Sequence, residues 1–498
     1  MRTLRFIYYK VSVVIMTAVA VASMSGCAMN PVSGMPELAL ISVEQEKKIG
    51  AEEAKKVQEH MGLLGDRALA SYLETLGQRL AMESPRRDVS YQFHGVDISE
   101  PNAFALPGGY IYVTRGLLAL TNSEDELAGV VGHEIGHVAA RHTVQRISKQ
   151  GPFAAVFGIA SGITGLISPF VGNLIGGVGD FTQSLIFSPY GRGQETEADR
   201  VGQEMAAKAG WDPAGLPRFL STLEREVELM SKGPQRHSFF DSHPATPDRV
   251  AKTTEHAKQV QQMSREPISA SPTVFLSRLD GLVVGQRAAN GMIQDRTFIH
   301  PDLNFFLEFP EKWQIENSPQ KLVAVAPDRN AAVMVSAVGE GDDPLDGARE
   351  VEKATKVSVV DKTQRTTVNG LPAARRHMDA DGKIGVDLTW IAHAGLVYQI
   401  TGLAPKNNFD SSRPVFTTVA QSFRPLSAEE RAGVKEKRIR LIKANAGETI
   451  ETLAARSNSA WTKEEIAVAN ALSVENRLEG GRLVKVAIAE PYVSKASR

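Results

Sequence analysis

Cysteine is nearly absent from the sequence, and neither sign of charge is in excess; each of these absences excludes a class of protein. The single cysteine, Cys27, rules out a disulfide within the chain. Lys plus Arg number 56 against 57 Asp plus Glu, so no basic surplus attracts a phosphate backbone, and we expect no nucleic-acid partner. The remaining composition, with 42% hydrophobic and 23% charged residues in 498, is typical of a folded chain with about two to four domains.

The position of Cys27 explains why the chain has a cysteine at all. Three basic residues precede an apolar run at residues 11–24, which is too short for a comfortable membrane span, and small residues then lead to Cys27. This order predicts an export signal over residues 1–26. It resembles the lipoprotein type of signal, which is cut before a cysteine that then carries lipid. An ordinary cleaved signal and a membrane anchor are the alternatives. Ala28 follows the cysteine, and by the same resemblance this favours the outer membrane, facing the periplasm.

Periodicity and turn residues divide the rest of the chain into three folded parts. Residues 27–262 have mostly helical spacing, with β-rich runs at 88–98 and 109–114, which predicts a mainly helical domain with a small sheet. Residues 290–427 alternate short β-rich runs with turns, so we predict a separate α+β domain with an antiparallel sheet. A small unit follows at residues 438–490. The predicted fold class is therefore α+β and multidomain.

Residues 151–180 have no charged side chain until Asp180, although glycines and Pro169 interrupt them. The length of this segment would span a bilayer. We favour helices that pack on the core or cover an active-site cleft. Contact with a membrane and a disordered flap are the alternatives.

The five residues HEIGH, from His133 to His137, have the spacing of a metal site. A helix turns by about 100° per residue, so histidines four apart project from one face and can bind one ion. Glu134 stands at the edge of that face, where it reaches water beside the ion without ligating it. This is the HExxH arrangement, in which two neutral imidazoles bind Zn²⁺ and the glutamate takes a proton from water. The helix is predicted to run from about Glu124 to about Lys149; a surface helix with two histidines is the alternative.

A third ligand is available in the sequence ETEAD at residues 195–199. Glu195 would complete a site of two histidines and one glutamate, with a fourth position open for water. Asp199, one helical turn further on, can accept a hydrogen bond from the far nitrogen of His133 or His137 and thereby fix its tautomer.

Two neighbouring residues are expected to stand apart from the ion. Glu197 projects about 200° from Glu195 on the same helix, which favours a solvent-facing side chain. His142 lies about 180° round the helix from His133 and cannot join the same ion. We expect it to be a surface histidine or a hydrogen-bond partner of a ligand.

Four segments of the chain resemble, in the expected order, the HtpX/CAAX-prenyl-protease superfamily of zinc metallopeptidases. They are NAFALPGGYIYVTRGLL (102–118), GHEIGHVAARH (132–142), YGRGQETEADRVG (190–202) and SHPATPDRV (242–250). The resemblance covers roughly residues 40–260 and is closest to the periplasmic BepA-like and LoiP-like branch. It implies a gluzincin-type domain that holds one zinc ion per chain. The implied site has His133, His137 and Glu195 as ligands, Glu134 as general base and Asp199 beside a ligand.

The same resemblance places His243 near the metal. There it would either stabilise the oxyanion of the reaction intermediate, as a catalytic residue, or act as a fourth ligand that keeps the enzyme latent. From the residues alone, a turn histidine that caps a helix is the alternative. Arg249 is expected to anchor the same loop through a carboxylate.

The β-rich run at 109–114 is expected to be an exposed edge strand, which pairs with an extended peptide through main-chain hydrogen bonds. An internal strand without substrate is the alternative. The candidate substrate contacts are Asn102, Gly109, Tyr110, Ile111 and Tyr112.

The two downstream parts carry weaker resemblances. Residues 441–488 resemble a LysM module of βααβ order, which implies peptidoglycan as a ligand; a purely structural module is the alternative. Residues 296–425 faintly resemble PsbP/Mog1-like domains and contain no catalytic constellation, so a protein-interaction role is expected.

Taken together, these features predict an exported zinc endopeptidase held in the periplasm by lipid on Cys27, at the outer rather than the inner membrane. Its expected substrates are unfolded or misassembled envelope proteins. The alternative is a latent protease that acts mainly as a chaperone or scaffold in outer-membrane assembly.

Overall fold

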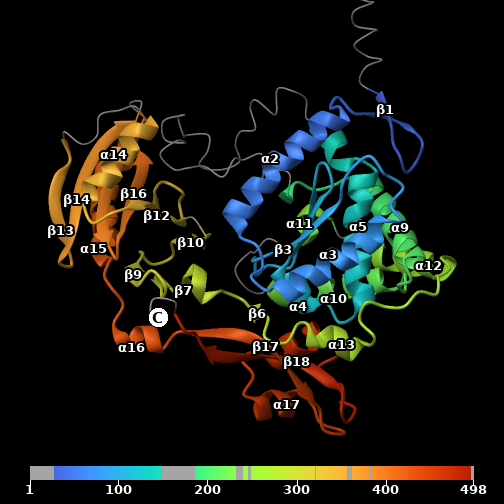
Figure 1. Cartoon of the computed structure of the whole chain (residues 1–498). Helices are drawn as coiled ribbons and strands as arrows, with labels where there is room; N and C mark the ends of the chain where they lie inside the picture. Colours follow the sequence, from blue (N-terminus) through green and yellow to red (C-terminus); the bar gives the residue numbers. More distant parts are fainter. Residues whose placement is uncertain are drawn as a thin grey trace, which may run out of the picture.

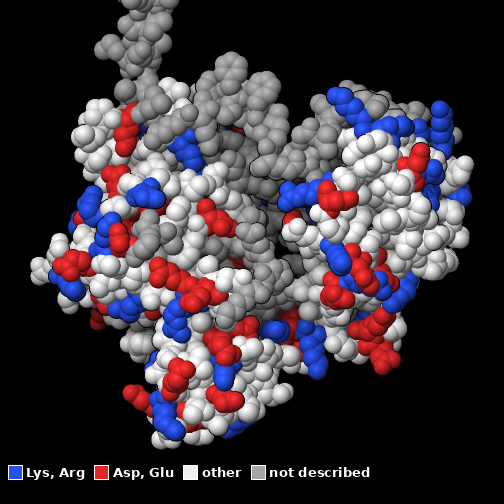
Figure 2. All heavy atoms as spheres, turned by 180° about the vertical axis from the view of Figure 1, so that it is seen from behind, with Lys and Arg blue, Asp and Glu red and all other residues white. Residues whose placement is uncertain are grey.

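The computed structural model describes residues 27–148, 186–231, 239–244, 248–319, 321–355, 362–380 and 383–494. The predicted export signal and the uncharged segment at 151–180 lie outside these described residues. Among the residues that are described, no helix is both long enough and apolar enough to cross a membrane. Figure 1 shows a helical lobe and a sheet-rich lobe side by side, with the C-terminal strands running beneath them. On the face seen in Figure 2, acidic and basic side chains are interspersed over both lobes.

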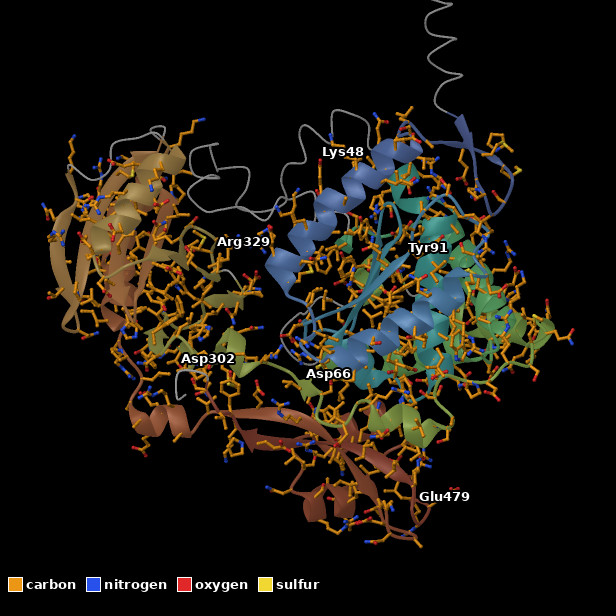
Figure 3. The ribbon with its side chains drawn as sticks, in the orientation of Figure 1. Lys48, Asp66, Tyr91, Asp302, Arg329 and Glu479 are labelled. Atoms are coloured by element: carbon orange, nitrogen blue, oxygen red, sulfur yellow. The ribbon has the colours of Figure 1, made fainter. Side chains whose placement is uncertain are left out.

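The helical lobe is formed by the first half of the chain and contains a small sheet. Its helices are α2 (Val43–Met61), α3 (Arg67–Ala81), α4 (Arg115–Leu120), α5 (Glu124–Ala139), α9 (Arg192–Lys208), α10 (Gly215–Met230), α11 (Phe239–Ser242) and α12 (Arg249–Gln259). An N-terminal hairpin, β1 (Cys27–Met29) and β2 (Pro36–Leu38), precedes them. Asp66 caps α3 by accepting hydrogen bonds from the backbone N–H groups of Ala68 and Leu69, and Lys48 lies on α2 (Figure 3).

The small sheet corrects the expectation of an exposed substrate strand at residues 109–114. Its strands are β3 (Gln92–Val96), β4 (Ala103–Leu106) and β5 (Tyr110–Thr114), in the order β3-β5-β4. Strand β5 is therefore central: it pairs in parallel with β3 and antiparallel with β4. Because both edges of β5 are already paired, the assignment of Gly109, Tyr110, Ile111 and Tyr112 to an edge strand was wrong. The outer strand beside α5 is β4, which the sequence analysis missed.

Helix α5 begins as predicted but ends ten residues early. Ser123 caps it, accepting a hydrogen bond from the backbone N–H of Glu126 at 3.2 Å. The helix stops at Ala139, and Arg141 has a positive φ of 57°, after which residues 142–148 form a separate helical run. The chain therefore changes direction directly after the HEIGH residues, and helical angles cannot be carried across Arg141.

Helices α5 and α9 touch through glycine, which brings the two distant motifs together. A methyl group added to Gly202 on α9 would lie 2.6 Å from the backbone nitrogen of His133. Added to Gly132 or Gly136 on α5, it would lie 2.8 Å and 2.9 Å from the backbone oxygens of Gly202 and Ala198. These distances are shorter than a carbon atom tolerates, so the helices can be this close only because these positions have no side chain.

The sheet-rich lobe contains a seven-stranded antiparallel sheet, as predicted for this part of the chain. Its order is β10-β11-β12-β16-β15-β14-β13. The strands are β10 (Gln314–Asn317), β11 (Leu322–Val325), β12 (Ala332–Glu340), β13 (Gln364–Val368), β14 (Leu371–Ala380), β15 (Ile384–His393) and β16 (Leu396–Pro405). Helices α14 (Pro344–Thr355) and α15 (Lys406–Ser422) pack on it, forming two separate apolar cores. A three-stranded sheet of β7 (Met292–Gln294), β8 (Thr297–His300) and β9 (Phe305–Glu308) lies before it in the chain.

The C-terminal unit is built into the helical lobe. It runs β17 (Lys435–Lys443), α17 (Ile450–Ser457), α18 (Lys463–Ala469) and β18 (Leu483–Pro491), after the short α16 (Ala428–Ala432). Its sheet is completed by β6 (Val283–Val284), which follows α13 (Pro272–Ser277) far upstream. The fully buried Lys485 on β18 donates hydrogen bonds to the carbonyl oxygens of Ala119 and Thr121, at 2.8 and 2.7 Å, just before α5.

The helix contact yields a first prediction. Gly202→Ala should lower the free energy of unfolding by about 1–3 kcal/mol, because the added methyl group overlaps the backbone of His133 and the helices must separate. Gly193→Ala on the same helix is the matched control, since no atom lies within 4 Å of the added carbon. Urea denaturation of the metal-free protein measures both. Equal stability of the two variants would contradict the packing argument.

Candidate metal centre

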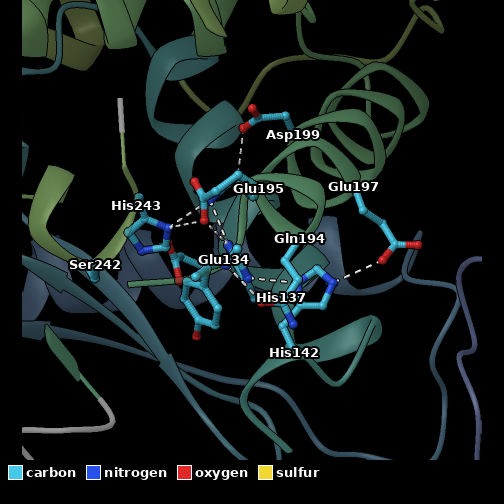
Figure 4. Close-up of polar contacts among 12 residues, drawn as sticks. Glu134, His137, His142, Gln194, Glu195, Glu197, Asp199, Ser242 and His243 are labelled. Carbon is cyan, nitrogen blue, oxygen red and sulfur yellow. Dashed lines mark hydrogen bonds and ion pairs between the residues drawn. The ribbon is translucent and has the colours of Figure 1, made fainter. Parts of the chain in front are cut away.

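Four buried side chains from three elements converge on one point. His133 and His137 come from α5, Glu195 from α9, and His243 follows α11; all are at most 3% exposed. The Nε2 atoms of the two α5 histidines are 2.9 Å apart, and Glu195 Oε1 lies 3.2 Å from His137 Nε2. The Nδ1 atom of His243 lies 3.2 Å from His133 Nε2 and 3.1 Å from Glu195 Oε1 (Figure 4).

The far nitrogen of His133 contacts a buried carboxylate, as predicted for Asp199. His133 Nδ1 lies 2.8 Å from Asp199 Oδ1. Arg249 on α12 holds the same carboxylate with two hydrogen bonds, from Nε at 2.9 Å and from an Nη atom at 2.8 Å. Its other Nη atom lies 2.7 Å from Glu195 Oε2 and also donates to the carbonyl oxygen of His243. Arg249 therefore ties the His243 loop to two carboxylates of α9.

Burial and neighbouring charges set the ionisation of the convergent groups. Burial lowers the pKa of His137 well below its ordinary value, so its imidazole is neutral at neutral pH. Burial opposes ionisation of Glu195, but the nearby His243, His137 and Arg249 lower the pKa of this carboxyl group well below its usual range. A neutral imidazole and an ionised carboxylate are the forms in which these residues bind metal ions.

Glu134 is fully buried beside these residues but makes no hydrogen bond with them. Neither of its carboxylate oxygens has a hydrogen-bond partner among the described residues, and Oε1 lies 3.4 Å from His243 Nε2. Burial raises the pKa of Glu134, although His243 and His133 partly oppose the shift. A buried carboxylate with vacant acceptor positions is costly unless something else engages it, which is typical of a functional group.

The arrangement fits a bound zinc ion. Because His133 donates from Nδ1 to Asp199, its Nε2 carries a lone pair that points at another ring nitrogen only 2.9 Å away. Nitrogen and carboxylate lone pairs repel one another unless a cation lies between them. Ligand atoms about 2.1 Å from a tetrahedral ion are separated by roughly 3.4 Å, close to the distances found here. Three nitrogens and one oxygen are an ordinary ligand set for zinc.

His142 is a hydrogen-bond partner of a ligand, which is one of the two alternatives expected for it, and Glu197 contacts it in turn. His142 is fully buried, with Nδ1 2.9 Å from His137 Nδ1 and Nε2 3.0 Å from Glu197 Oε2 (Figure 4). The helical angle of about 180° between His133 and His142 does not apply, because the helix ends before His142, at Ala139. Glu197, which was expected to face solvent, is only partly exposed, because its carboxylate is bonded to His142 and to Asn30.

Tyr190 is a residue of the site that the sequence analysis missed. Its ring stacks on His137, with 3.9 Å between ring centroids, and its hydroxyl group lies 2.9 Å from that of Thr143. Its backbone N–H donates to the carbonyl oxygen of Ser242, directly before His243. The segment YGRGQETEAD contained the signal, since Tyr190 begins the stretch that leads to Glu195.

Asn102 lies at the start of β4 and is buried. Its backbone N–H donates to Thr114 Oγ1 at 2.8 Å, while its side-chain Oδ1 has no hydrogen-bond partner among the described residues. The adjacent carbonyl oxygen of Pro101 accepts a hydrogen bond from the backbone N–H of Phe239 at 3.0 Å. Helix α11, which leads to His243, therefore rests against the beginning of the edge strand.

Comparison with known proteins agrees with this geometry. Residues 67–257 match the model of peptidase family M48. The chain is 29% identical over 246 residues to the beta-barrel assembly-enhancing protease of Yersinia pestis, covering 48% of this chain and 49% of that protein. It is 28% identical over 240 residues to the mitochondrial metalloendopeptidase OMA1 of Schizosaccharomyces pombe, covering 46% and 66%. It is 31% identical over 152 residues to the metalloprotease YcaL of Escherichia coli, covering 30% and 56%.

The family match, at residues 67–257, lies in the helical lobe. The chain spans about half the length of the beta-barrel assembly-enhancing proteases it matches, at 49% and 52%. The matched segment contains the convergent histidines and Glu195. Residues 67–257 are accordingly similar to metallopeptidases of family M48, and the site has the ligand set of a zinc centre.

Arg249 provides the prediction for this site. Arg249→Ala should lower the free energy of unfolding of the metal-free protein by about 3–5 kcal/mol, because it leaves Asp199 and Glu195 buried without their cation. Arg200→Ala on α9 removes an exposed partner of Glu204 and should cost less than about 1 kcal/mol. A loss from Arg249→Ala no larger than the control's would contradict this role.

Proposed function

We propose that this chain is a zinc-dependent endopeptidase whose ligands are His133, His137 and Glu195. The observation that carries the proposal is the convergence of three imidazole nitrogens and one carboxylate oxygen on one buried point. Beside them lies Glu134, whose carboxylate has no hydrogen-bond partner in the part of the chain that the structure describes. Zinc, when bound, supplies Lewis acidity, which makes water nucleophilic at neutral pH and polarises a peptide carbonyl group.

In this proposal the chain's own groups move the proton. Glu134 accepts a proton from the attacking water as its oxygen bonds to the carbonyl carbon, and donates that proton to the leaving amine nitrogen when the C–N bond breaks. The raised pKa of Glu134 suits both roles, because a carboxylate whose pKa is nearer to neutrality is a stronger base towards water and, once protonated, is still acidic enough to protonate the leaving amine. Asp199 and Arg249 keep His133 in the tautomer that leaves Nε2 free.

We assign His243 to the ligand set in this conformation. Its Nδ1 atom occupies the fourth corner of the cluster, 3.1–3.2 Å from Glu195 Oε1 and His133 Nε2. Catalytic zinc sites keep one position open, whereas four protein ligands make a closed site. The conformation described here is therefore latent, and His243 with α11 has to withdraw before water and substrate can enter.

The substrate is an extended peptide that pairs with β4. This strand is the outer strand of its sheet beside α5, so a peptide added there would run past Glu134. The unpaired Oδ1 of Asn102 would accept a hydrogen bond from that peptide. Main-chain pairing selects few side chains, which suits cleavage of unfolded proteins. Because α11 rests against Pro101, withdrawal of α11 would expose both the metal site and the edge of β4.

The cellular setting is also a proposal. The sequence before Cys27 supports export and a lipid anchor, which would hold the enzyme in the periplasm, at the outer rather than the inner membrane. The names of the similar beta-barrel assembly-enhancing proteases support unfolded or misassembled envelope proteins as substrates. The βααβ order of residues 435–491 supports the LysM-like assignment and peptidoglycan as a ligand of that unit.

The closed site favours one other candidate function. A protease held latent by four ligands could act mainly as a chaperone or scaffold in outer-membrane assembly. The two candidates differ in what the zinc-loaded protein does to unfolded protein, either cleaving it or only binding it.

Glu134→Gln tests the catalytic proposal. It should lower kcat/KM for unfolded casein by about 10²–10⁴-fold, because the amide cannot accept the proton, while the zinc content stays unchanged. Glu204→Gln, at a partly exposed position on α9, is the matched control and should leave cleavage unchanged. Equal cleavage by Glu134→Gln and the wild type would contradict the mechanism.

His243→Ala tests the latent state. It should raise the rate of casein cleavage, because it vacates the fourth ligand position without touching the other three. His256→Ala is the matched control, because its ring contacts Gln203 and Glu204 on α9 and is not part of the cluster. Lower cleavage by His243→Ala, with zinc still bound, would instead assign His243 to oxyanion stabilisation. Binding of casein without cleavage in every variant would favour the scaffold.

A further inference from the structure

His137 has a buried partner on the side facing away from the convergent ligands. Its Nδ1 atom lies 2.9 Å from His142 Nδ1, and the two rings meet edge to face with 4.9 Å between centroids. His142 is fully buried and lies after α5, where the turn at Arg141 brings the chain back against the helix. Two imidazoles this close must share a hydrogen, so one ring donates and the other accepts.

The other end of His142 decides which ring donates. Its Nε2 atom lies 3.0 Å from Glu197 Oε2, and a carboxylate oxygen only accepts. His142 therefore has its hydrogen on Nε2 and a lone pair on Nδ1. That lone pair accepts from His137 Nδ1–H, which leaves the lone pair of His137 on Nε2, the atom that faces the other ligands. The position of each ring hydrogen between Glu197, His142 and His137 is thereby determined, and His137 is in the tautomer that binds metal.

The carboxylate of Glu197, which accepts from His142, is itself held in place. Glu197 stands on α9 two residues after Glu195, and its side chain is 19% exposed. Its Oε2 accepts a second hydrogen bond, at 3.2 Å, from the side-chain amide of Asn30, which is almost fully buried. Asn30 directly follows β1 and also donates to Glu37 on β2 at 2.9 Å. The N-terminal hairpin is thus connected to His137 through Glu197 and His142.

We propose that His142 and Glu197 are positioning residues for the metal ligand His137, with Asn30 of the N-terminal hairpin holding Glu197 in place. Together they fix the tautomer and the ring plane of His137, as Asp199 and Arg249 do for His133. Each α5 histidine is thereby oriented by a carboxylate of α9: His133 by Asp199, which α12 holds through Arg249, and His137 through His142 by Glu197, which the hairpin holds through Asn30. The inference rests on the metal-binding part of the proposed function and is independent of peptide cleavage.

Zinc affinity of the purified full chain tests this role directly, by competition with a chromophoric chelator. His142→Leu should bind zinc roughly 10–100-fold more weakly, because His137 loses the acceptor that fixes its tautomer. His142→Gln should recover most of that loss, since its amide can accept from His137 and donate to Glu197. Glu197→Ala should weaken binding in the same direction, whereas Glu204→Ala, a carboxylate removed from the same helix, should leave it unchanged.

A second measurement separates positioning from a general loss of structure. Cobalt(II) bound in place of zinc should give a visible absorption spectrum that His142→Leu alters at saturating cobalt and that His142→Gln restores. Unchanged zinc affinity and an unchanged cobalt spectrum in a folded His142→Leu would overturn the inference. Should that variant fail to fold, Glu197→Ala decides, because its partly exposed side chain can be removed with little loss of packing; wild-type affinity there would overturn the inference as well.

Failure of this inference differs from failure of the proposed function. If the wild-type chain binds no zinc, both the proposed function and this inference are wrong. If the wild type and all four variants bind zinc equally, only the positioning role is lost. Asn30→Ala extends the test to the hairpin, where a smaller loss of affinity in the same direction is expected.

Discussion

The close contact between α5 and α9 is the constraint on which the site depends. Gly132, Gly136 and Gly202 allow the two backbones to approach until an added methyl group would overlap the neighbouring chain. Only at this separation does Glu195 reach the two histidines of α5. Residues that are about sixty positions apart in the sequence thus form one cluster without a disulfide, which a chain with a single cysteine could not have supplied.

Charge balance explains the side chains around that cluster. Three imidazole nitrogens and one carboxylate oxygen face one another in a buried space, an arrangement that favours a cation at its centre. Outside the cluster, Arg249 compensates Asp199 and Glu195, while His142 and Glu197 lie on the opposite side. Glu134 is the exception, since it is buried beside the ligands and has no hydrogen-bond partner within the described ranges of the chain. It is therefore the group in the best position to exchange a proton with a substrate.

Much of the site could be predicted from the sequence, because helical spacing and ligand chemistry are local properties. Spacing alone brought forward His133, His137, Glu195 and Asp199, and the antiparallel sheet of the second lobe followed from its alternating β-rich runs. Of the two alternatives for His142, a surface residue or a hydrogen-bond partner of a ligand, the structure has the second. Helical angles could not decide between them, because the positive φ of Arg141 redirects the chain. Glu197 was misjudged because its partners lie on other elements, and β4 was missed because its four residues are too few for periodicity to show. The pairing of β6 with β17 joins residues about 150 positions apart, which no local pattern indicates.

The central claim is that one ion is held jointly by α5 and α9. Zinc bound per chain, measured by elemental analysis after dialysis against a low free-zinc buffer, tests it most directly in the wild type and in Glu195→Ala. The account predicts one zinc per wild-type chain and loss of that zinc from a folded Glu195→Ala variant, because the variant lacks both the only anionic ligand of the cluster and the only ligand that α9 supplies. A folded Glu195→Ala protein that keeps one zinc with the wild-type affinity would contradict the account.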